Sequence, residues 1–297
     1  MSPQFHVLQE LFTTTQRYPQ KIAVMLDDQA WTYSELIENI ACVVNHLHNL
    51  QVAQGQIIYQ YVDRGFEMIC GFFGILCTDG VYCSINPTEP RDRLADLRQQ
   101  IQGQYVLLHT RTRHQFPSTA VRHVISLDAV LYPLSCDEKI HDLPTCSGRG
   151  AAYIICTSGT TGRQKLVVHT HKSFSASACS YSRWNIPMYA VRDQVLQVAS
   201  CSWILHITEI SMTLIMGGTL VLLRPGGQLD MSYFSRTLSH QQVTTLLIGP
   251  AIIRALTSYL EMARQYETFK FVRHLCTSGT FRFLTDPVCF TNLLNAI

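Results

Sequence analysis

The chain has 297 residues, of which 47% are hydrophobic and 15% are charged, a composition typical of a globular protein with one large or two medium domains. Its net charge of +2 gives no indication that nucleic acid or an anionic membrane surface is a partner. The 11 cysteines contain no CxxC pair, so neither a disulfide framework nor a metal site is predicted, and a reducing, cytoplasmic location is expected. The sequence shows no signal-peptide pattern and no unbroken apolar run of membrane-spanning length.

Hydrophobic periodicity and turn residues predict alternating strands and helices along the whole chain. The first half is expected to contain helices at 7–12, 35–50, 66–78 and 91–101, the second of them capped by Ser34, and strands at 21–25, 31–33, 55–61, 81–85, 104–109 and 121–127. After a polar loop at 131–149, we expect strands at 151–156, 166–168, 194–200, 219–223, 243–248 and 271–276, and helices at 173–181, 231–240 and 251–264, with another helix ending at Met216. This order predicts an α/β fold with doubly wound sheets flanked by helices.

The most informative stretch runs from Tyr153 to Val168 and reads YIICTSGTTGRQKLVV. An apolar run leads into six residues that are all glycine or hydroxylated, Thr157 to Gly162, and Lys165 follows. Glycine lets the backbone approach a ligand closely, while backbone N–H groups, hydroxyls and a lysine can surround an anion. The spacing does not fit the GxxxxGK[ST] phosphate loop. The composition therefore fits a loop that holds phosphate oxygens and an ordinary surface hairpin about equally well.

The order TSGTTGxxK after a strand resembles the signature loop of the adenylate-forming (AMP-binding) superfamily. This superfamily includes acyl-CoA synthetases, luciferases and the adenylation domains of nonribosomal peptide synthetases. The usual family form has Pro and Gly where this chain has Gln164 and Leu166, on either side of the retained lysine. The resemblance implies that the phosphates of ATP are bound by Thr157, Ser158, Gly159, Thr160, Thr161, Gly162 and Lys165.

Three further segments are similar to the family, and closest to peptide-synthetase adenylation domains. The first, Trp31-Thr32-Tyr33-x-Glu-Leu, resembles the family's Leu-Thr-Tyr-x-Glu-Leu. The second follows Asp79 and agrees with a proline-rich structural segment of the family at Gly80, Tyr82, Pro87, Pro90, Arg93 and Leu94. The third resembles Phe-Asp-x-Ser-x-x-Glu-Ile followed by a helix and Gly-Gly-Thr-Leu, and agrees at Glu209, Ile210, Gly217, Gly218, Thr219 and Leu220.

The third segment implies an acid-substrate pocket at Trp203, Ile204 and His206. Ile204 stands where amino-acid-activating members have the aspartate that binds the α-ammonium of the substrate. Because a buried ammonium without a partner is costly, a standard α-amino acid is not expected, and an aryl, hydroxy, keto or fatty acid suits an apolar wall better. His206 is either a substrate contact or an ordinary structural histidine.

A last similarity lies near the end of the chain. Arg273, Leu275 and Gly279 agree with the family's Leu-Arg-x-Leu-x-x-Gly-Gly-Glu, whereas Ser278 and Thr280 replace Gly and Glu. This turn lies beside the nucleotide in the family. The resemblance therefore implies that Ser278, Gly279 and Thr280 lie in the vicinity of the nucleotide.

The resemblance covers nearly the whole chain but only the first part of the family's large domain. We expect residues 1–297 to form a partial AMP-binding domain that can divide into subdomains near 185–195. The family's adenine-stacking motif, its magnesium ligand and the C-terminal lid with the catalytic lysine would lie beyond Ile297. No complete catalytic set and no metal ligand is therefore expected within these residues.

The resemblance implies the N-terminal portion of an ATP-dependent carboxylate-activating ligase. Full-length members join a carboxylic acid to the α-phosphate of ATP with Mg²⁺, release pyrophosphate, and pass the acyl group to the thiol of a phosphopantetheine carrier protein or of CoA. One alternative is a catalytically inactive nucleotide-binding or interaction remnant of the family, which Gln164, Ile204 and Thr280 suggest. A second is an unrelated doubly wound phosphate-binding protein.

Overall fold

A computed structural model of the chain describes residues 6–117, 121–132, 148–157, 165–183 and 189–277. The strands are β1 Ile22–Leu26, β2 Gln29–Thr32, β3 Ile57–Tyr61, β4 Val81–Ser84, β5 Tyr105–Leu108, β6 His123–Ser126, β7 Ala151–Thr157, β8 Lys165–Thr170, β9 Gln194–Gln197, β10 Thr219–Leu222, β11 Thr245–Ile248 and β12 His274–Thr277. The α-helices are α1 Val7–Arg17, α2 Tyr33–Asn49, α3 Phe66–Cys77, α4 Arg91–Gln100, α5 Leu127–Leu131, α6 His171–Arg183, α7 Ile204–Ile215, α8 Met231–His240 and α9 Pro250–Ala263. Short 3₁₀ turns are η1 Thr110–Gln115, η3 Gly227–Leu229 and η4 Tyr266–Phe269.

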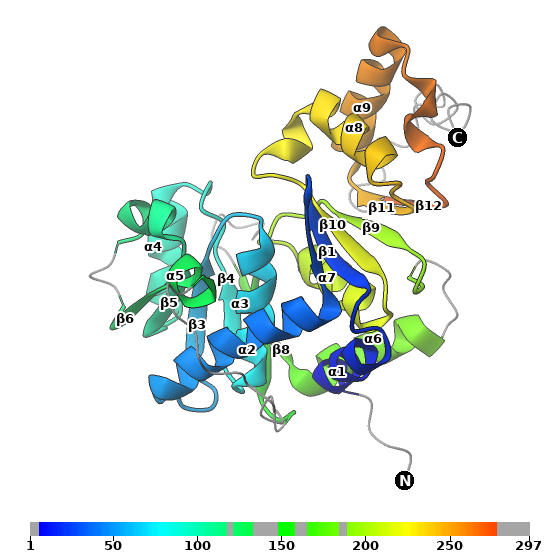
Figure 1. Cartoon of the computed structure of the whole chain (residues 1–297). Coiled ribbons are helices and arrows are strands. Elements are labelled where there is room, and N and C mark those ends of the chain that lie inside the picture. Colours follow the sequence, from blue (N-terminus) through cyan, green and yellow to red (C-terminus); the bar gives the residue numbers. More distant parts are fainter. Residues whose placement is uncertain (1–5, 118–120, 133–147, 158–164, 184–188, 278–297) are drawn as a thin grey trace.

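The strands form two sheets with helices packed on them (Figure 1). Sheet A has the order β12-β11-β9-β10-β1-β2, and sheet B has the order β6-β5-β3-β4-β7-β8. All neighbouring strands are parallel except the pairs β1–β2 and β7–β8, which are antiparallel. The predicted α/β class with doubly wound, helix-flanked sheets is confirmed.

The chain changes from sheet B to sheet A between β8 and β9. The amino-terminal hairpin of β1 and β2 nevertheless belongs to sheet A, because β1 pairs with β10 through Val24 and Leu220. Residues 22–32 therefore complete the sheet that the second half of the chain builds. Local patterning could not foresee this, since pairing between segments nearly 200 residues apart leaves no local signal.

Helix α2 begins earlier than expected, and its cap is Thr32 rather than Ser34. The Thr32 hydroxyl accepts a hydrogen bond from the Glu35 backbone N–H at 3.2 Å, and the Glu35 carboxylate accepts one from the Thr32 backbone N–H at 2.7 Å. This reciprocal pair is a capping box, which satisfies two otherwise unpaired donors at the start of the helix. The reciprocal bond with Glu35 is therefore the reason that Thr32, and not Ser34, is the N-cap of α2.

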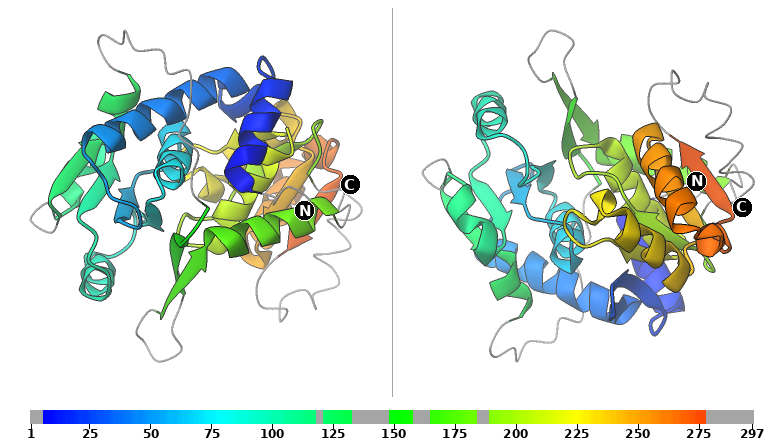
Figure 2. Two further views of the ribbon diagram at one scale, coloured as in Figure 1. Left: turned by 90° about the horizontal axis from the view of Figure 1, so that it is seen from below. Right: turned by 90° about the horizontal axis from the view of Figure 1, so that it is seen from above.

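Two long helices pack closely at Gly74 of α3. A methyl group built on Gly74 would lie 2.6 Å from a methyl carbon of Val43 on α2, so only glycine allows this approach. Nearly every side chain of α3 is buried, which explains its continuous apolar sequence. The figures show α2 running across both halves of the molecule (Figures 1 and 2).

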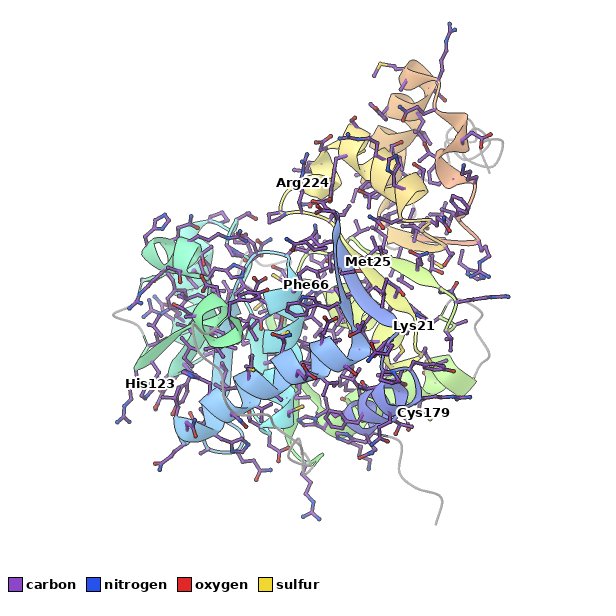
Figure 3. All side chains as sticks on the ribbon, in the orientation of Figure 1. Lys21, Met25, Phe66, His123, Cys179 and Arg224 are labelled. Carbon is purple, nitrogen blue, oxygen red and sulfur yellow. The ribbon has the colours of Figure 1, made fainter. Side chains whose placement is uncertain are left out.

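Aromatic side chains join the two halves where β2 and α2 meet the rest of the chain. The rings of Trp31 on β2 and Phe66 on α3 stack at 4.4 Å. Figure 3 shows Phe66 at the boundary between the halves. The buried Tyr33 hydroxyl lies 3.0 Å from the carbonyl oxygen of Leu214 and 2.7 Å from that of Gly218, at the end of α7. The position of α7 therefore depends on α2.

We expect Tyr33→Phe to lower the free energy of unfolding by roughly 1–3 kcal/mol, because the one buried O–H proton shared by the Leu214 and Gly218 carbonyl groups is lost. Urea denaturation followed by circular dichroism measures this change. Tyr132→Phe removes a hydroxyl from a side chain that is 53% exposed and should change stability by less than about 0.5 kcal/mol. Equal effects of the two substitutions would show that the Tyr33 hydroxyl contributes nothing specific.

Candidate functional site

The predicted phosphate loop is closed by the β7–β8 hairpin. Thr157, the last residue of β7, pairs with Lys165, the first residue of β8. The two strands extend from the body of the molecule as an antiparallel pair (Figure 2). The predicted site residues Ser158, Gly159, Thr160, Thr161 and Gly162 lie outside the described residues. Lys165 is exposed at the base of this loop, so its ammonium is accessible to a bound anion.

The turn implied to lie near the nucleotide follows β12. Ser278, Gly279 and Thr280 lie outside the described residues, directly after Thr277. The Arg273 guanidinium pairs with the buried Asp193 carboxylate, and the Thr244 hydroxyl donates to the same carboxylate at 2.8 Å. Asp193, which directly precedes β9, thus contacts the residues that directly precede β11 and β12.

Trp203 is the N-cap of α7 and Ile204 is its first residue. Trp203 is 59% exposed and Ile204 is 38% exposed, so both are accessible to a ligand. Ile204 also lies at the edge of a cavity of about 170 Å³ between α6, α7 and the β7–β8 hairpin. We call it the Ile204 cavity; it is lined by Tyr153, His169, Ser173, Phe174, Ser177, Ala178, Ile204, Ile207, Thr208, Ser211 and Met212.

The lining of the Ile204 cavity is neutral. It contains aromatic rings, aliphatic side chains and hydroxyl groups, but no Asp, Glu, Lys or Arg side chain. The single titratable ring with a pKa near neutrality is that of His169, and burial lowers its pKa, which favours the uncharged imidazole. The cavity therefore suits an uncharged, partly apolar group.

Of the three predicted pocket residues, Ile204 alone lines the Ile204 cavity. Trp203 is exposed outside that lining, and the ring of His206 is fully buried. Nε2 lies 3.2 Å from the Tyr82 hydroxyl on β4, so His206 contacts sheet B. Burial and the neighbouring Arg64 cation lower the pKa of His206 to about 3, and the ring is neutral at physiological pH.

A buried polar chain that the sequence analysis did not select runs beneath the start of α7. Arg64 Nε donates to Gln197 Oε1 at 2.6 Å, and Gln197 Nε2 donates to a Glu209 carboxylate oxygen at 2.8 Å. The Ala199 backbone N–H donates to the same carboxylate oxygen at 3.1 Å. The sequence offered a signal, because Glu209 is the one acidic residue of the helix ILHITEISMTLI and matches the family's third segment.

Side chains from sheet B hold the loop that leads into α7. The Ser84 hydroxyl donates to the Cys201 carbonyl at 2.6 Å, and Asn86 Nδ2 donates to the Ser200 hydroxyl oxygen at 3.0 Å. Arg64 donates to the Val198 carbonyl at 2.9 Å, and the Ser202 hydroxyl donates to the Glu89 carboxylate. The proline-rich exit from β4 therefore positions the loop from which Trp203 and Ile204 project.

Among the described residues, no group of three or more His, Cys, Asp or Glu side chains could hold a metal ion. None of the helices in the described ranges combines the length and apolar character needed to cross a bilayer.

Burial raises the pKa of Glu209 to about 7, although its hydrogen bonds and the Arg64 cation oppose the rise. In the unfolded chain the carboxyl ionises at lower pH, so this group stabilises the fold below about pH 4.5 and the contribution is lost as pH rises toward 7. We expect the difference in unfolding free energy between wild type and Glu209→Gln to change by roughly 3 kcal/mol across this window.

Chemical denaturation at closely spaced pH values measures this difference. The exposed substitution Glu38→Gln serves as the control, and its difference from wild type should stay nearly constant with pH. If the difference in unfolding free energy between wild type and Glu209→Gln also stays constant with pH, the buried carboxyl is ionised throughout the range.

A comparison with family profiles finds one match, described as AMP-binding enzyme, over residues 11–281. Among curated proteins, a mycosubtilin synthase polypeptide of Bacillus subtilis is 29% identical over 277 residues, which are 93% of this chain and 10% of the synthase polypeptide. Gramicidin S synthase 2 of Brevibacillus brevis is 28% identical, over 92% of this chain and 6% of its own length. The chain thus spans a tenth or less of these two relatives.

Solved structures share the fold. The N-terminal subdomain of Klebsiella oxytoca NpsA has a TM-score of 0.84 at 23% identity and covers 99% of this chain and 72% of its own. The AMPPNP-bound form of the nonribosomal peptide synthetase FmoA3 has a TM-score of 0.83 at 22% identity, over 94% of this chain and 29% of its own. The family match extends over most of the chain and includes both sheets. The chain therefore belongs to the AMP-binding enzyme family and has the fold of the N-terminal subdomain of peptide-synthetase adenylation domains.

Proposed function

We propose that this chain is the nucleotide- and acid-binding portion of an ATP-dependent ligase that activates a carboxylic acid lacking an α-ammonium group. The reaction joins the carboxylate oxygen to the α-phosphorus of ATP and releases pyrophosphate, which gives an acyl-AMP. The observation that carries the acid class is Ile204, an apolar side chain at the position of the family's ammonium-binding aspartate, next to a cavity without charged residues.

ATP binding is supported by the β7–β8 hairpin. Residues 157–165 supply glycines, hydroxyls and a lysine in the family order, and the Thr157–Lys165 pair closes the stem. In this proposal Lys165 neutralises charge on the departing phosphates, and the hairpin positions them for in-line displacement. Ser278, Gly279 and Thr280 would lie beside the nucleotide. Mg²⁺ would neutralise phosphate charge when bound.

The acid would lie against Trp203 and Ile204, with its non-carboxylate part directed toward the Ile204 cavity. A cavity of about 170 Å³ lined by rings and hydroxyls fits an aryl or short hydroxylated acid better than a long fatty chain. The NpsA subdomain was solved with 3-hydroxybenzoyl-AMSN, whose 3-hydroxybenzoyl part is a hydroxylated aryl acyl group. The buried His206 would not contact the acid. It would support the start of α7 through its contact with the Tyr82 hydroxyl.

The acyl group would pass to a thiol. The curated relatives are synthases, and an artificially fused adenylation–PCP di-domain of NpsA shares the fold. A phosphopantetheine carrier protein is therefore the favoured acceptor, with CoA as the second candidate. Such chemistry belongs in the cytoplasm, where ATP and carrier proteins occur.

A second candidate function is a catalytically inactive remnant that binds a nucleotide or a partner. Gln164, Ile204 and Thr280 favour it, because each departs from the family pattern at or beside the site.

We expect Lys165→Ala to weaken ATP binding by roughly 10- to 100-fold, since a charge-assisted hydrogen bond contributes about 1.5–3 kcal/mol. Isothermal titration calorimetry of the chain with and without Mg²⁺ measures the affinity. Lys172→Ala is the matched control, because Lys172 is an exposed lysine at the second position of α6, and it should bind as wild type does.

An affinity unchanged by Lys165→Ala would contradict the phosphate role of the hairpin. ATP binding that is absent from the folded wild-type chain would favour the inactive remnant.

A further inference from the structure

A second, separate pocket lies where the carboxyl ends of four strands meet. It occupies about 80 Å³ and is formed by the segments that follow β3, β4, β9 and β10, at Asp63–Arg64, Asn86–Thr88, Ala199–Cys201 and Pro225–Gln228. In α/β proteins the carboxyl ends of parallel strands are the usual place for a ligand. The volume is several times that needed for one water molecule. We call it the Arg64 pocket.

The guanidinium of Arg64 lies in this pocket without a negative partner. Its three hydrogen bonds go to Gln197 Oε1, Gln228 Oε1 and the Val198 carbonyl oxygen, at 2.6, 2.9 and 2.9 Å. All three acceptors are neutral, and in the described part of the chain no carboxylate lies within ion-pair distance of Arg64. A guanidinium has five N–H groups, so two remain for another acceptor.

The Arg64 side chain is partly exposed, so its charge is only partly removed from water. Burial lowers its pKa because removal from water disfavours the cation, and the nearby Glu209 carboxylate opposes this shift. A buried charge is normally paired or neutralised. The carboxylate of Glu209 is reached only through the intervening amide of Gln197. A small anion in the pocket would satisfy both the remaining N–H groups and the uncompensated charge.

The other walls can also donate hydrogen bonds. Asn86 and Gln228 contribute amides and Ser200 contributes a hydroxyl, whereas the Thr88 hydroxyl already donates to Asn86 Oδ1 at 2.9 Å. Asp63 is the one carboxylate of the lining, and it lies 3.4 Å from the Arg111 guanidinium, which offsets its charge.

We propose that the Arg64 pocket binds a small oxyanion, either inorganic phosphate or a small carboxylate, at a site distinct from the β7–β8 hairpin and the Ile204 cavity. The anion bridges sheet B and sheet A through Arg64 and adds to the contacts that position the loop before α7. The pocket shares no lining residue with the Ile204 cavity.

The test is isothermal titration calorimetry of the whole chain with inorganic phosphate and, separately, with acetate. The informative variant is Gln228→Glu, which has nearly the same shape and places a carboxylate beside the Arg64 guanidinium. It should keep the fold and its melting temperature while weakening anion binding by at least about tenfold. Gln102→Glu adds the same charge at an exposed position before β5, where the amino ends of the parallel strands of sheet B lie. This control should bind the anion as wild type does.

Lys165→Ala separates this site from the proposed ATP loop, because it should leave the affinity for phosphate at the Arg64 pocket unchanged. Binding of phosphate or acetate that Gln228→Glu removes and Lys165→Ala retains supports the proposal, and the better ligand identifies the anion class. The proposal is overturned if wild type binds neither anion, if Gln228→Glu binds as wild type does, or if Lys165→Ala removes the binding. The last result would instead support the phosphate role of the hairpin.

Discussion

The contact on which the arrangement of the two sheets most depends is the Arg64 guanidinium at the end of β3. It donates to the end of β9 through Gln197 and the Val198 carbonyl, and so joins sheet B to sheet A by hydrogen bonds. The Arg64 side chain is partly buried, and its three hydrogen bonds to neutral acceptors satisfy part of its donor capacity. The same polar chain continues to Glu209, so the first turns of α7 are tied to both sheets.

This connection explains how a structural segment supports a candidate site. Asn86 and Ser84 hold the loop at Ser200 and Cys201, and that loop directly precedes Trp203 and Ile204. The exit from β4 therefore helps to position the candidate acid pocket. The hairpin of β7 and β8 belongs to the same sheet, next to β4. Sheet B thus carries the candidate phosphate loop and positions the acid wall, while sheet A carries the strand that leads to the proposed nucleotide turn.

Much of the fold could be predicted from the sequence, because the elements differ in local pattern. The apolar run of α3 and the glycine-rich loop after β7 stand out clearly, and the family itself could be identified from short motifs. The cap of α2 was assigned to Ser34 because both Ser and Thr are good caps, and only the reciprocal bond with Glu35 distinguishes Thr32. The pairing of β1 with β10 and the contact between Arg64 and Gln197 join distant segments, so they have no signature in a single sequence. His206 was grouped with Ile204 by proximity in the chain, but the rotation of a helix turns its ring toward Tyr82 instead.

The central claim is that the acid pocket selects a substrate without an α-ammonium. The most direct test is calorimetric binding of two stable acyl-adenylate analogues, benzoyl- and phenylalanyl-sulfamoyl-adenosine, to wild type and to Ile204→Asp. We expect wild type to bind the benzoyl compound at least roughly tenfold more tightly, and we expect Ile204→Asp to narrow or reverse this preference by pairing the ammonium. If wild type binds the phenylalanyl compound equally or more tightly, the pocket does not select against an α-ammonium.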